Sequence, residues 1–325
     1  MNDLGKAGAK VLEIGPDSAG QRLDNFLHKV LKGAPSSLVY RIIRSGEVRV
    51  NKGRARPETR LAADDRVRVP PLALDDPGRH AAAGAARAGG DLHVLFEDDA
   101  LLAIDKPSGV AVHGGSGLAF GVIEALRAAR PQATFLELAH RLDRDTSGVL
   151  LLAKKRAMLV AVHALIREHR VDKRYLALAR GRWPHAAKHH LTSALKSRVV
   201  GGERRVAATD EADMDAKDAH SVVSVARRFA DATLLEVQLR TGRTHQIRVH
   251  LAAAGHPIVG DDKYGDPEVN RAASRAGFRR MFLHAAKISF VRPDDGTRLR
   301  LEAPLPDDCS TYLRTLAPLP RALAT

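Results

Sequence analysis

Two carboxylates lie among basic residues in the segment from His140 to Gly148, and they are the side chains here best suited to chemistry. Asp143 and Asp145 have arginines beside them and precede the apolar run Val149–Ala153. A carboxylate next to a guanidinium stays ionised, as a nucleophile or a general base requires. The same carboxylates could instead hydrogen-bond the backbone of the Thr-Ser-Gly turn that follows them. Both interpretations stay open on these residues alone.

Tyr175 follows two basic residues at the start of a predicted strand, Tyr175–Ala179. A tyrosine is common on a strand face and needs no function to explain it. Alternatively, its ring stacks on a flat ligand such as a base while its hydroxyl stays in contact with water.

A third segment, 241–250, combines turn residues with a basic helix start. Thr244 suits the N-cap of a helix predicted over 245–254. Arg243 and His245 would then lie near the positive end of that helix and attract phosphate. Arg248 is off the apolar stripe and would point into a cleft. The alternative is a basic helix end that simply faces solvent.

Motifs for several other chemistries are missing from the sequence. Neither a Gly-x-x-x-x-Gly-Lys-Ser/Thr loop nor a His-Glu-x-x-His pair occurs, and Phe120 replaces the third glycine of a dinucleotide fingerprint. One cysteine, Cys309, excludes disulfide scaffolds and cysteine-based zinc or iron–sulfur sites within one chain. We therefore expect no metal site.

Charge and hydropathy indicate the kind of partner. Lys and Arg number 52 against 38 Asp and Glu, a net charge of +14, while aromatic residues make up 4%. This excess favours a polyanionic partner, nucleic acid first and an anionic membrane second. No apolar run approaches the roughly 18 residues of a membrane helix. We expect a soluble cytoplasmic protein.

The length of 325 residues predicts two domains. We expect a flexible tail at 1–19, a small basic domain at 20–72, an Ala/Gly-rich linker at 73–91 and a larger domain at 92–318. Residues 1–72 carry a net charge of +6, whereas the other 253 carry +8. Positive charge is therefore concentrated in the small domain.

Periodicity within the larger domain predicts a mixture of strands and helices, with some strands adjacent, so the class is α+β rather than a regular βαβ array. The polar stretch 183–218 is expected to be an irregular, exposed insertion. The predicted strands are 92–96, 101–104, 149–153, 175–179, 233–239, 282–290 and 298–302. The predicted helices are 119–129, 156–169 and 245–254.

Together these segments resemble the RluA family of pseudouridine synthases. The resemblance spans about 92–303 and keeps the family's order of motifs. These motifs are 105–109, 140–148, 173–175, 241–250, 260–266 and 282–285. The segment around Lys217–Ser221 departs from the family pattern, because Ser221 stands where the family has threonine.

The resemblance implies the family's fold, a mixed, largely antiparallel bent sheet with flanking helices, and its reaction, isomerisation of uridine to pseudouridine without a cofactor. It places the catalytic aspartate on Asp143 and the base-stacking tyrosine on Tyr175. The arginine that pairs with the aspartate falls on Arg248. The arginine that helps to open the RNA falls on Arg141.

The small domain resembles an S4 RNA-binding domain, an α/β unit. S4 plus this catalytic domain is similar to family members that modify large-subunit (23S) ribosomal RNA. That RNA, or a pre-ribosomal particle, is the expected partner, and the expected state is a monomer. Each basic side chain could equally be a solvated surface charge. The candidates for phosphate contacts are Arg41, Arg44, Lys52, Arg54 and Arg56.

Two alternatives from other functional classes remain. One is a non-catalytic RNA-binding factor for ribosome assembly, which would use the same basic surface. The other is a metal-dependent nuclease using Asp143, Asp145 and the pair Asp261–Asp262. The arginines around Asp143 argue against the nuclease, because a divalent cation prefers a net negative site.

Overall fold

The structure, a computed structural model, describes residues 9–31, 34, 36–71, 92–114, 121–200, 203–209 and 215–319. Its described residues form two compact units. The smaller contains 9–71, and the larger contains 92–112 and 132–319. The segment 121–131 groups with the smaller unit, whereas the sequence assigned it to the larger. The predicted linker, 73–91, lies outside the described residues.

The smaller unit buries one face of two helices against a four-stranded sheet of order β1-β4-β2-β3. Leu23 and Leu27 recur at helical spacing and join Val39 and Ile42 in a common core. The elements are β1 (Lys10–Glu13), a 3-10 turn η1 (Pro16–Ser18), α1 (Leu23–Val30), α2 (Ser36–Arg44), β2 (Arg49–Val50), β3 (Gly53–Arg54) and β4 (Arg66–Val69).

Strand β1 corrects the expected tail at 1–19. It pairs antiparallel with β4, with Val11 opposite Arg68. Ile14 follows it and is fully buried in the core of the smaller unit. Pairing with β4 gives hydrogen-bond partners to the backbone groups of β1, which would otherwise bond only to water. The strand therefore depends on a partner far along the chain. Residues 1–8 lie outside the described part of the chain.

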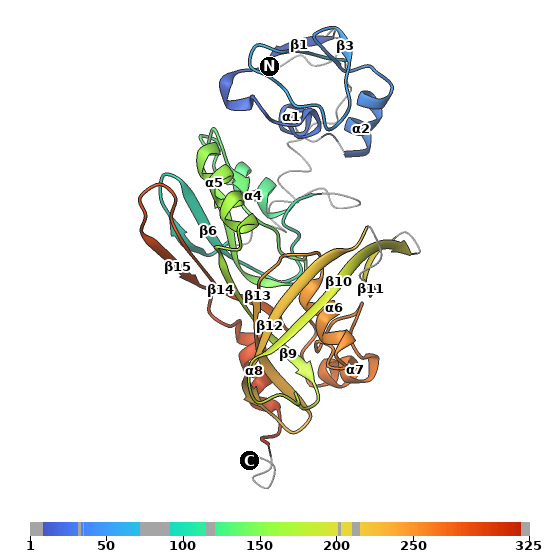
Figure 1. Ribbon diagram of the computed structural model, residues 1–325, viewed down its shortest axis with the longest axis vertical. Coiled ribbons are helices and arrows are strands. Elements are labelled where there is room, and N and C mark those ends of the chain that lie inside the picture. Colours follow the sequence, from blue (N-terminus) through green and yellow to red (C-terminus); the bar gives the residue numbers. More distant parts are fainter. Residues whose placement is uncertain are drawn as a thin grey trace. The chain divides into compact units, whose positions relative to one another are not determined.

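The larger unit is built on one mixed sheet of eleven described strands (Figure 1). The order is β11-β10-β12-β13-β9-β14-β8-β6-β5, with β15 beside β14 and β7 beside β8. Most pairs are antiparallel and β14 with β8 is parallel, which confirms the α+β class. The strands are β5 (Val94–Glu97), β6 (Leu101–Lys106), β7 (Glu137–Leu138), β8 (Ser147–Ala153), β9 (Asp172–Arg180), β10 (His189–Val200), β11 (Glu203–Thr209), β12 (Lys217–Arg228), β13 (Ala232–Leu239), β14 (Leu283–Val291) and β15 (Arg298–Glu302).

Helices cover different parts of this sheet. Helix α5 packs its apolar stripe, Met158, Val162 and Leu165, on the strands around β8, and α6 lies on β10, β11 and β12. Figure 1 shows α6 and α7 together beside the long strands. The helices are α4 (Val122–Ala129), α5 (Arg156–Arg167), α6 (Gln246–Ala253), α7 (Pro267–Arg275) and α8 (Asp307–Thr315). None of the described helices is long and apolar enough to span a bilayer.

The stretch 183–218 is mostly sheet, not the irregular insertion expected from the sequence. Strands β10 and β11 form a hairpin, and β12 begins at Lys217. Leu195 and Val206 of the hairpin pack on Val249 of α6. The sequence conceals this because the inward residues of each strand are few and separated by polar ones. The exposed positions that are described include His190, Thr192 and Arg205, polar side chains that an edge hairpin tolerates.

Strand β8 lies between β6 and β14 and is buried along its whole length. Its Gly148 has φ +108° and faces the backbone of Ala285 in β14, where a Cβ atom would collide. Only glycine permits this close parallel pairing. The chain just before β8 is therefore fixed in place by the centre of the sheet.

Candidate active site

Asp143 lies in the connection from β7 to β8, four residues before the first residue of β8. The Thr146 N–H donates to the Asp143 carbonyl at 3.2 Å, which closes the turn. The Asp143 side chain is 26% exposed, so its carboxylate meets solvent at the edge of a buried strand. A side chain that acts on a bound substrate needs this exposure.

Arg248 projects from α6 and joins two carboxylates. Its Nη1 donates to Asp143 Oδ2 at 3.2 Å, while Nε and Nη2 donate to Asp261 at 2.6 and 2.8 Å. The Arg248 side chain is 9% exposed and that of Asp261 is fully buried. A forked pair with Asp261 fixes the guanidinium plane, and the remaining donor is aimed at Asp143.

Asp261 stays charged despite its burial. Burial alone raises its pKa, but the Arg248 guanidinium and the backbone N–H groups of Tyr264 and Lys263 hold that pKa below its usual value. Burial likewise lowers the pKa of Arg248, and the two carboxylates more than reverse this effect. Both partners of the ion pair therefore stay charged, and the pair orients Arg248 toward Asp143.

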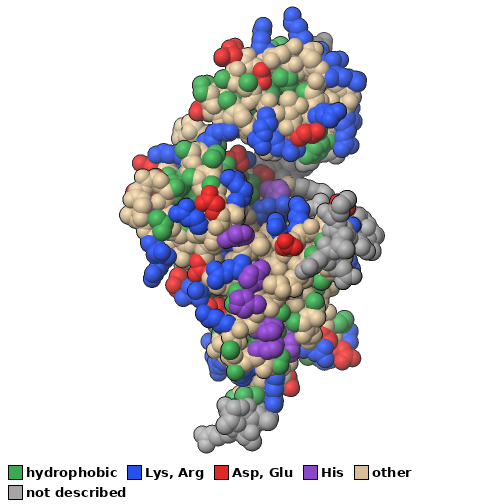
Figure 2. Space-filling model, viewed as in Figure 1, with side chains coloured by type: hydrophobic (Ala, Val, Ile, Leu, Met, Phe, Trp, Pro, Cys, Tyr) green, Lys and Arg blue, Asp and Glu red, His purple; other side chains and the backbone are tan. Residues whose placement is uncertain are grey.

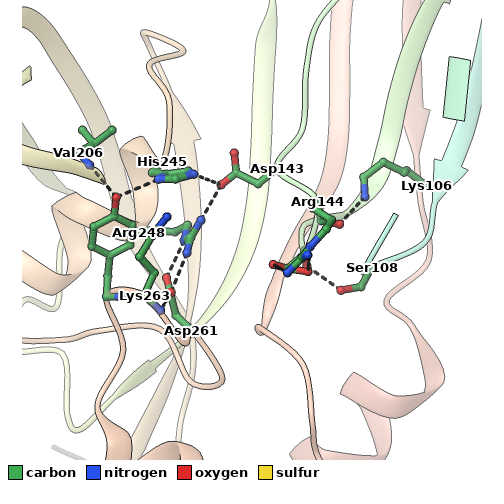
Figure 3. A network of polar contacts seen from close by, with 11 residues as sticks. Lys106, Ser108, Asp143, Arg144, Val206, His245, Arg248, Asp261 and Lys263 are labelled. Atoms are coloured by element: carbon green, nitrogen blue, oxygen red, sulfur yellow. Dashed lines mark hydrogen bonds and ion pairs between the residues drawn. The ribbon is translucent and has the colours of Figure 1, made fainter. Parts of the chain in front are cut away.

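His245 and Tyr264 complete this side of the site (Figure 3). The Tyr264 ring lies 4.9 Å from the Arg248 guanidinium carbon. Its hydroxyl accepts from Val206 N–H at 2.8 Å and lies 2.9 Å from His245 Nδ1. The other ring nitrogen of His245, Nε2, is 3.9 Å from Asp143 Oδ2.

The other side of the Asp143 turn is held by β6 (Figure 3). The fully buried Lys106 ammonium donates to the carbonyls of Pro107, Val110 and Arg144 at 2.8, 2.8 and 2.9 Å. Ser108 Oγ donates to the Asp145 carbonyl at 2.7 Å. Burial lowers the pKa of Lys106 to about 7, although three carbonyl acceptors match its three N–H donors. These contacts fix the backbone that follows Asp143.

Tyr175 of β9 belongs to the same site. It lies opposite Val237 of β13, and only 7% of it is exposed. Burial raises its pKa, and the negative charge of Asp143 adds to that effect. The sequence predicted a hydroxyl in contact with water. The structure instead buries nearly all of the residue, because β9 is an inner strand of the sheet.

Two of the other residues predicted for the catalytic domain, Arg141 and Arg243, lie outside this network. Arg141 is exposed two residues before Asp143. Arg243 is exposed and donates through Nε to the Asp218 carbonyl at 3.0 Å. Thr244 is not the N-cap of α6: His245 occupies that position with φ +54°, and Gln246 accepts from the Arg243 N–H. His245 faces Asp143, although the sequence suggested a phosphate contact.

The five basic candidates of the smaller unit are surface residues. Arg41 Nη1 is 3.8 Å from Glu47, and Arg44 lies 5.8 Å from the Tyr40 ring centre. Arg41 and Arg44, with Tyr40 and Ser45, line a groove of about 680 Å³. Lys52, Arg54 and Arg56 lie in and beside the short hairpin of β2 and β3.

Sequence reasoning gave no role to Lys106 or Tyr264. Both lie in family motifs, but nothing local says what they contact. Lys106 ends an otherwise mostly apolar strand and precedes a proline, an unusual place for a charge. Tyr264 is one of only 4 tyrosines. The position of Lys106 and the rarity of tyrosine were the signals that the sequence offered.

The acidic cluster required by the nuclease interpretation does not form. Asp143 and Asp261 both turn to Arg248, whose single positive charge offsets part of their combined charge. Among the described residues, no group of three or more His, Cys, Asp or Glu side chains could hold a metal ion. The geometry suits a carboxylate that acts on its own.

Residues 100–253 match the RNA pseudouridylate synthase family, and residues 21–67 match the S4 domain. The chain is 50% identical to ribosomal large subunit pseudouridine synthase C of Pasteurella multocida over 309 residues, 94% of each chain. It is 49% identical to that of Escherichia coli K12 over 311 residues, 94% of this chain and 96% of the relative.

A solved structure shares the fold of the larger unit. Human RNA pseudouridylate synthase domain containing 4 aligns with a TM-score of 0.59 at 24% identity, over 75% of this chain and all of the human one. Sequence likeness along almost the whole chain and this common fold agree with each other. The chain belongs to the RNA pseudouridylate synthase family, with an S4 domain preceding its catalytic domain.

Proposed function

We propose that this protein converts uridines of large-subunit ribosomal RNA into pseudouridine. The relatives at about 50% identity carry the name of that activity. The observation that carries the proposal is the carboxylate of Asp143, partly exposed and held through one oxygen by Arg248.

The reaction needs no added atoms. The uridine C1′–N1 bond breaks, the base turns, and C5 bonds to C1′ while the hydrogen of C5 leaves as a proton and N1 takes up a proton. Asp143 acts at the sugar or the base, and Arg248 positions it. We assign the stacking on the flipped base to the ring of Tyr175.

The target base must leave its stack, at a cost of about a few kcal/mol. Stacking on an aromatic ring returns roughly 1–3 kcal/mol. Arg141, exposed beside Asp143, is positioned to contact the opened RNA. Phosphate contacts offset the remainder. We assign such contacts to Arg243 of the larger unit and to the five basic residues of the smaller one.

The partner is large-subunit rRNA, free or within a pre-ribosomal particle, and we expect the protein to act as a cytoplasmic monomer. The predicted division, with an S4-like domain at 20–72 and a catalytic domain at 92–318, gives binding and chemistry separate surfaces. Residues 21–67 match the S4 domain, which supports this division.

The decisive experiment incubates the purified protein with large-subunit rRNA that carries tritium at uridine C5. Forming the new bond expels that hydrogen, so tritium should appear in water up to a plateau that counts the modified sites. No release from either free rRNA or precursor particles, with tight binding and intact RNA, would favour the assembly factor over the enzyme.

A further inference from the structure

Both polar contacts of the Asp143 carboxylate meet the same oxygen. Arg248 Nη1 lies 3.2 Å from Oδ2, and His245 Nε2 lies 3.9 Å from that atom. Within the described part of the chain, no hydrogen bond ends on Oδ1. The two oxygens therefore differ: Oδ2 receives both contacts, and Oδ1 receives neither.

The contacts of Tyr264 favour one tautomer of His245. The phenol oxygen accepts from the Val206 N–H, so its own hydrogen is free to be donated to His245 Nδ1 at 2.9 Å. A neutral imidazole that accepts at Nδ1 must carry its hydrogen on Nε2. That hydrogen then points at Asp143 (Figure 3).

We propose that His245 is a positioning residue that donates an uncharged Nε2–H to Asp143 Oδ2, leaving Oδ1 as the oxygen that reacts. The inference rests on the proposed function, because it assigns a task within that reaction. The separation of 3.9 Å is longer than a hydrogen bond, and such contacts commonly shorten when substrate binds.

The backbone of His245 supports a dedicated role. It adopts φ +54° and ψ +20°, a left-handed conformation that few non-glycine residues occupy. Such strain persists where the surroundings determine it, and it concentrates at functional sites. Here it turns the ring toward Asp143 and leaves the side chain only 16% exposed, a poor geometry for a phosphate contact on the surface.

The charged neighbours favour the uncharged ring. Burial lowers the pKa of His245, and the cations Arg248 and Lys263 lower it further, although the carboxylates of Asp143 and Asp261 act in the opposite direction. At neutral pH the histidine therefore donates a hydrogen bond without adding a positive charge. Among the described residues, Arg248 is the cation that hydrogen-bonds to Asp143.

Nitrogen-15 NMR on protein with labelled histidine tests the tautomer without any substrate. The wild type should show a His245 with a protonated Nε2 and a bare Nδ1 at neutral pH. Loss of that signal in His245→Asn assigns it. Tyr264→Phe, which keeps the ring over Arg248, should give a mixture of tautomers. A wild-type His245 that is protonated on Nδ1, or charged, would overturn the assignment.

Single-turnover tritium release separates positioning from binding. His245→Asn suits the left-handed backbone, because asparagine tolerates it. Its rate at saturating RNA should fall roughly tenfold, as expected when a hydrogen bond to a charged group is removed, with the RNA concentration for half-saturation unchanged. The matched control is His190→Asn, an exposed histidine that bonds His220 outside the site.

Each other outcome has a defined meaning. A wild-type rate in His245→Asn refutes the positioning role, and weaker RNA binding at an unchanged saturated rate makes His245 a phosphate contact instead. If the wild-type protein releases no tritium from any rRNA substrate, the proposed function fails. The tautomer measurement would then still confirm or refute the hydrogen-bond chain from Val206 to Asp143.

Discussion

The basic residues predicted to bind RNA in the smaller unit and the buried cations of the active site are placed in opposite ways. In the smaller unit, the Arg41 side chain is 64% exposed and its nearest carboxylate is 3.8 Å away. In the larger unit, Arg248 and Lys106 are buried and use their donors on named acceptors. Figure 2 shows many Lys and Arg side chains protruding from the surface of the smaller unit.

The exposed basic residues serve the affinity for RNA, whereas the buried ones serve the geometry of the active site. An exposed cation binds phosphate by releasing counterions, and its effect weakens with salt. A buried cation with satisfied donors has nothing left for phosphate, and it orients its acceptors instead. Substitutions in the two units should therefore change different observables, namely the salt dependence of binding and the rate at saturation.

The largest expected effect is on the rate, from Asp143→Asn. Removing the charge removes the reacting group, so tritium release should fall to background. RNA affinity should change little, because the carboxylate contributes no attraction to phosphate. Filter binding and single-turnover release on the same preparation measure both quantities. Substantial residual turnover would exclude Asp143 from the catalytic role.

Substituting Arg248 breaks its buried ion pair with Asp261. The effects on the reaction rate and on the unfolding free energy can then be compared. Arg248→Met leaves the charge of Asp261 buried and unpaired, which should cost about 3–5 kcal/mol of unfolding free energy. Adding Asp261→Asn should recover part of that stability without restoring tritium release. Fluorescence of Trp183, the one tryptophan in the chain, follows unfolding of the larger unit alone.

If the double variant regained activity, orientation by Arg248 would not matter. If the single variant were as stable as the wild type, the pair would not be buried in solution. Arg170→Met, an exposed arginine paired only with Glu168, is the control and should leave both quantities unchanged.

Lys106 should leave a signature in the pH dependence of stability. Its pKa in the folded chain is about 7, below the ordinary 10.5 expected after unfolding. Between these values the unfolded chain binds more protons, so unfolding free energy rises with pH by up to about 1.4 kcal/mol per unit. Below pH 7 Lys106 adds no slope.

Lys106→Met lacks this contribution. The difference between wild type and variant in denaturant unfolding, followed by Trp183 fluorescence from pH 6 to 10, isolates it. Equal slopes for the two proteins would mean that Lys106 keeps its ordinary pKa, and that its three carbonyl acceptors compensate fully for burial.

The smallest effect per residue belongs to the smaller unit. Arg41→Gln with Arg44→Gln should weaken RNA binding and reduce the salt slope by about 0.9 for each phosphate that the variant no longer neutralises. The saturated rate should stay at the wild-type value. Arg66→Gln, on β4 of the same unit, tests whether position matters or only total charge. Because Arg66→Gln removes one charge and the pair removes two, half of the loss in binding free energy would favour charge alone.

Local patterns predicted most elements of the larger unit. The strand at 298–302 has the bounds expected, and α5 begins at Arg156 as predicted. These segments have strong periodicity and clear ends. The hairpin of β10 and β11 was missed because its apolar positions are sparse, and its stability comes from packing on α6. Strand β1 was missed because its partner is β4, some 55 residues away.

The sequence by itself predicted the reactive groups: its resemblance to the family pointed to Asp143, Tyr175 and Arg248 before any geometry. Only the tertiary structure decided how they are held. Asp143 and Arg248 are 105 residues apart in the sequence. Asp261 and Tyr264 follow α6 in the chain and contact Arg248. Such contacts depend on sheet order and helix placement. The local sequence does not predict which oxygen of Asp143 is held or which nitrogen of His245 carries the proton. Both depend on neighbours that are distant in the sequence.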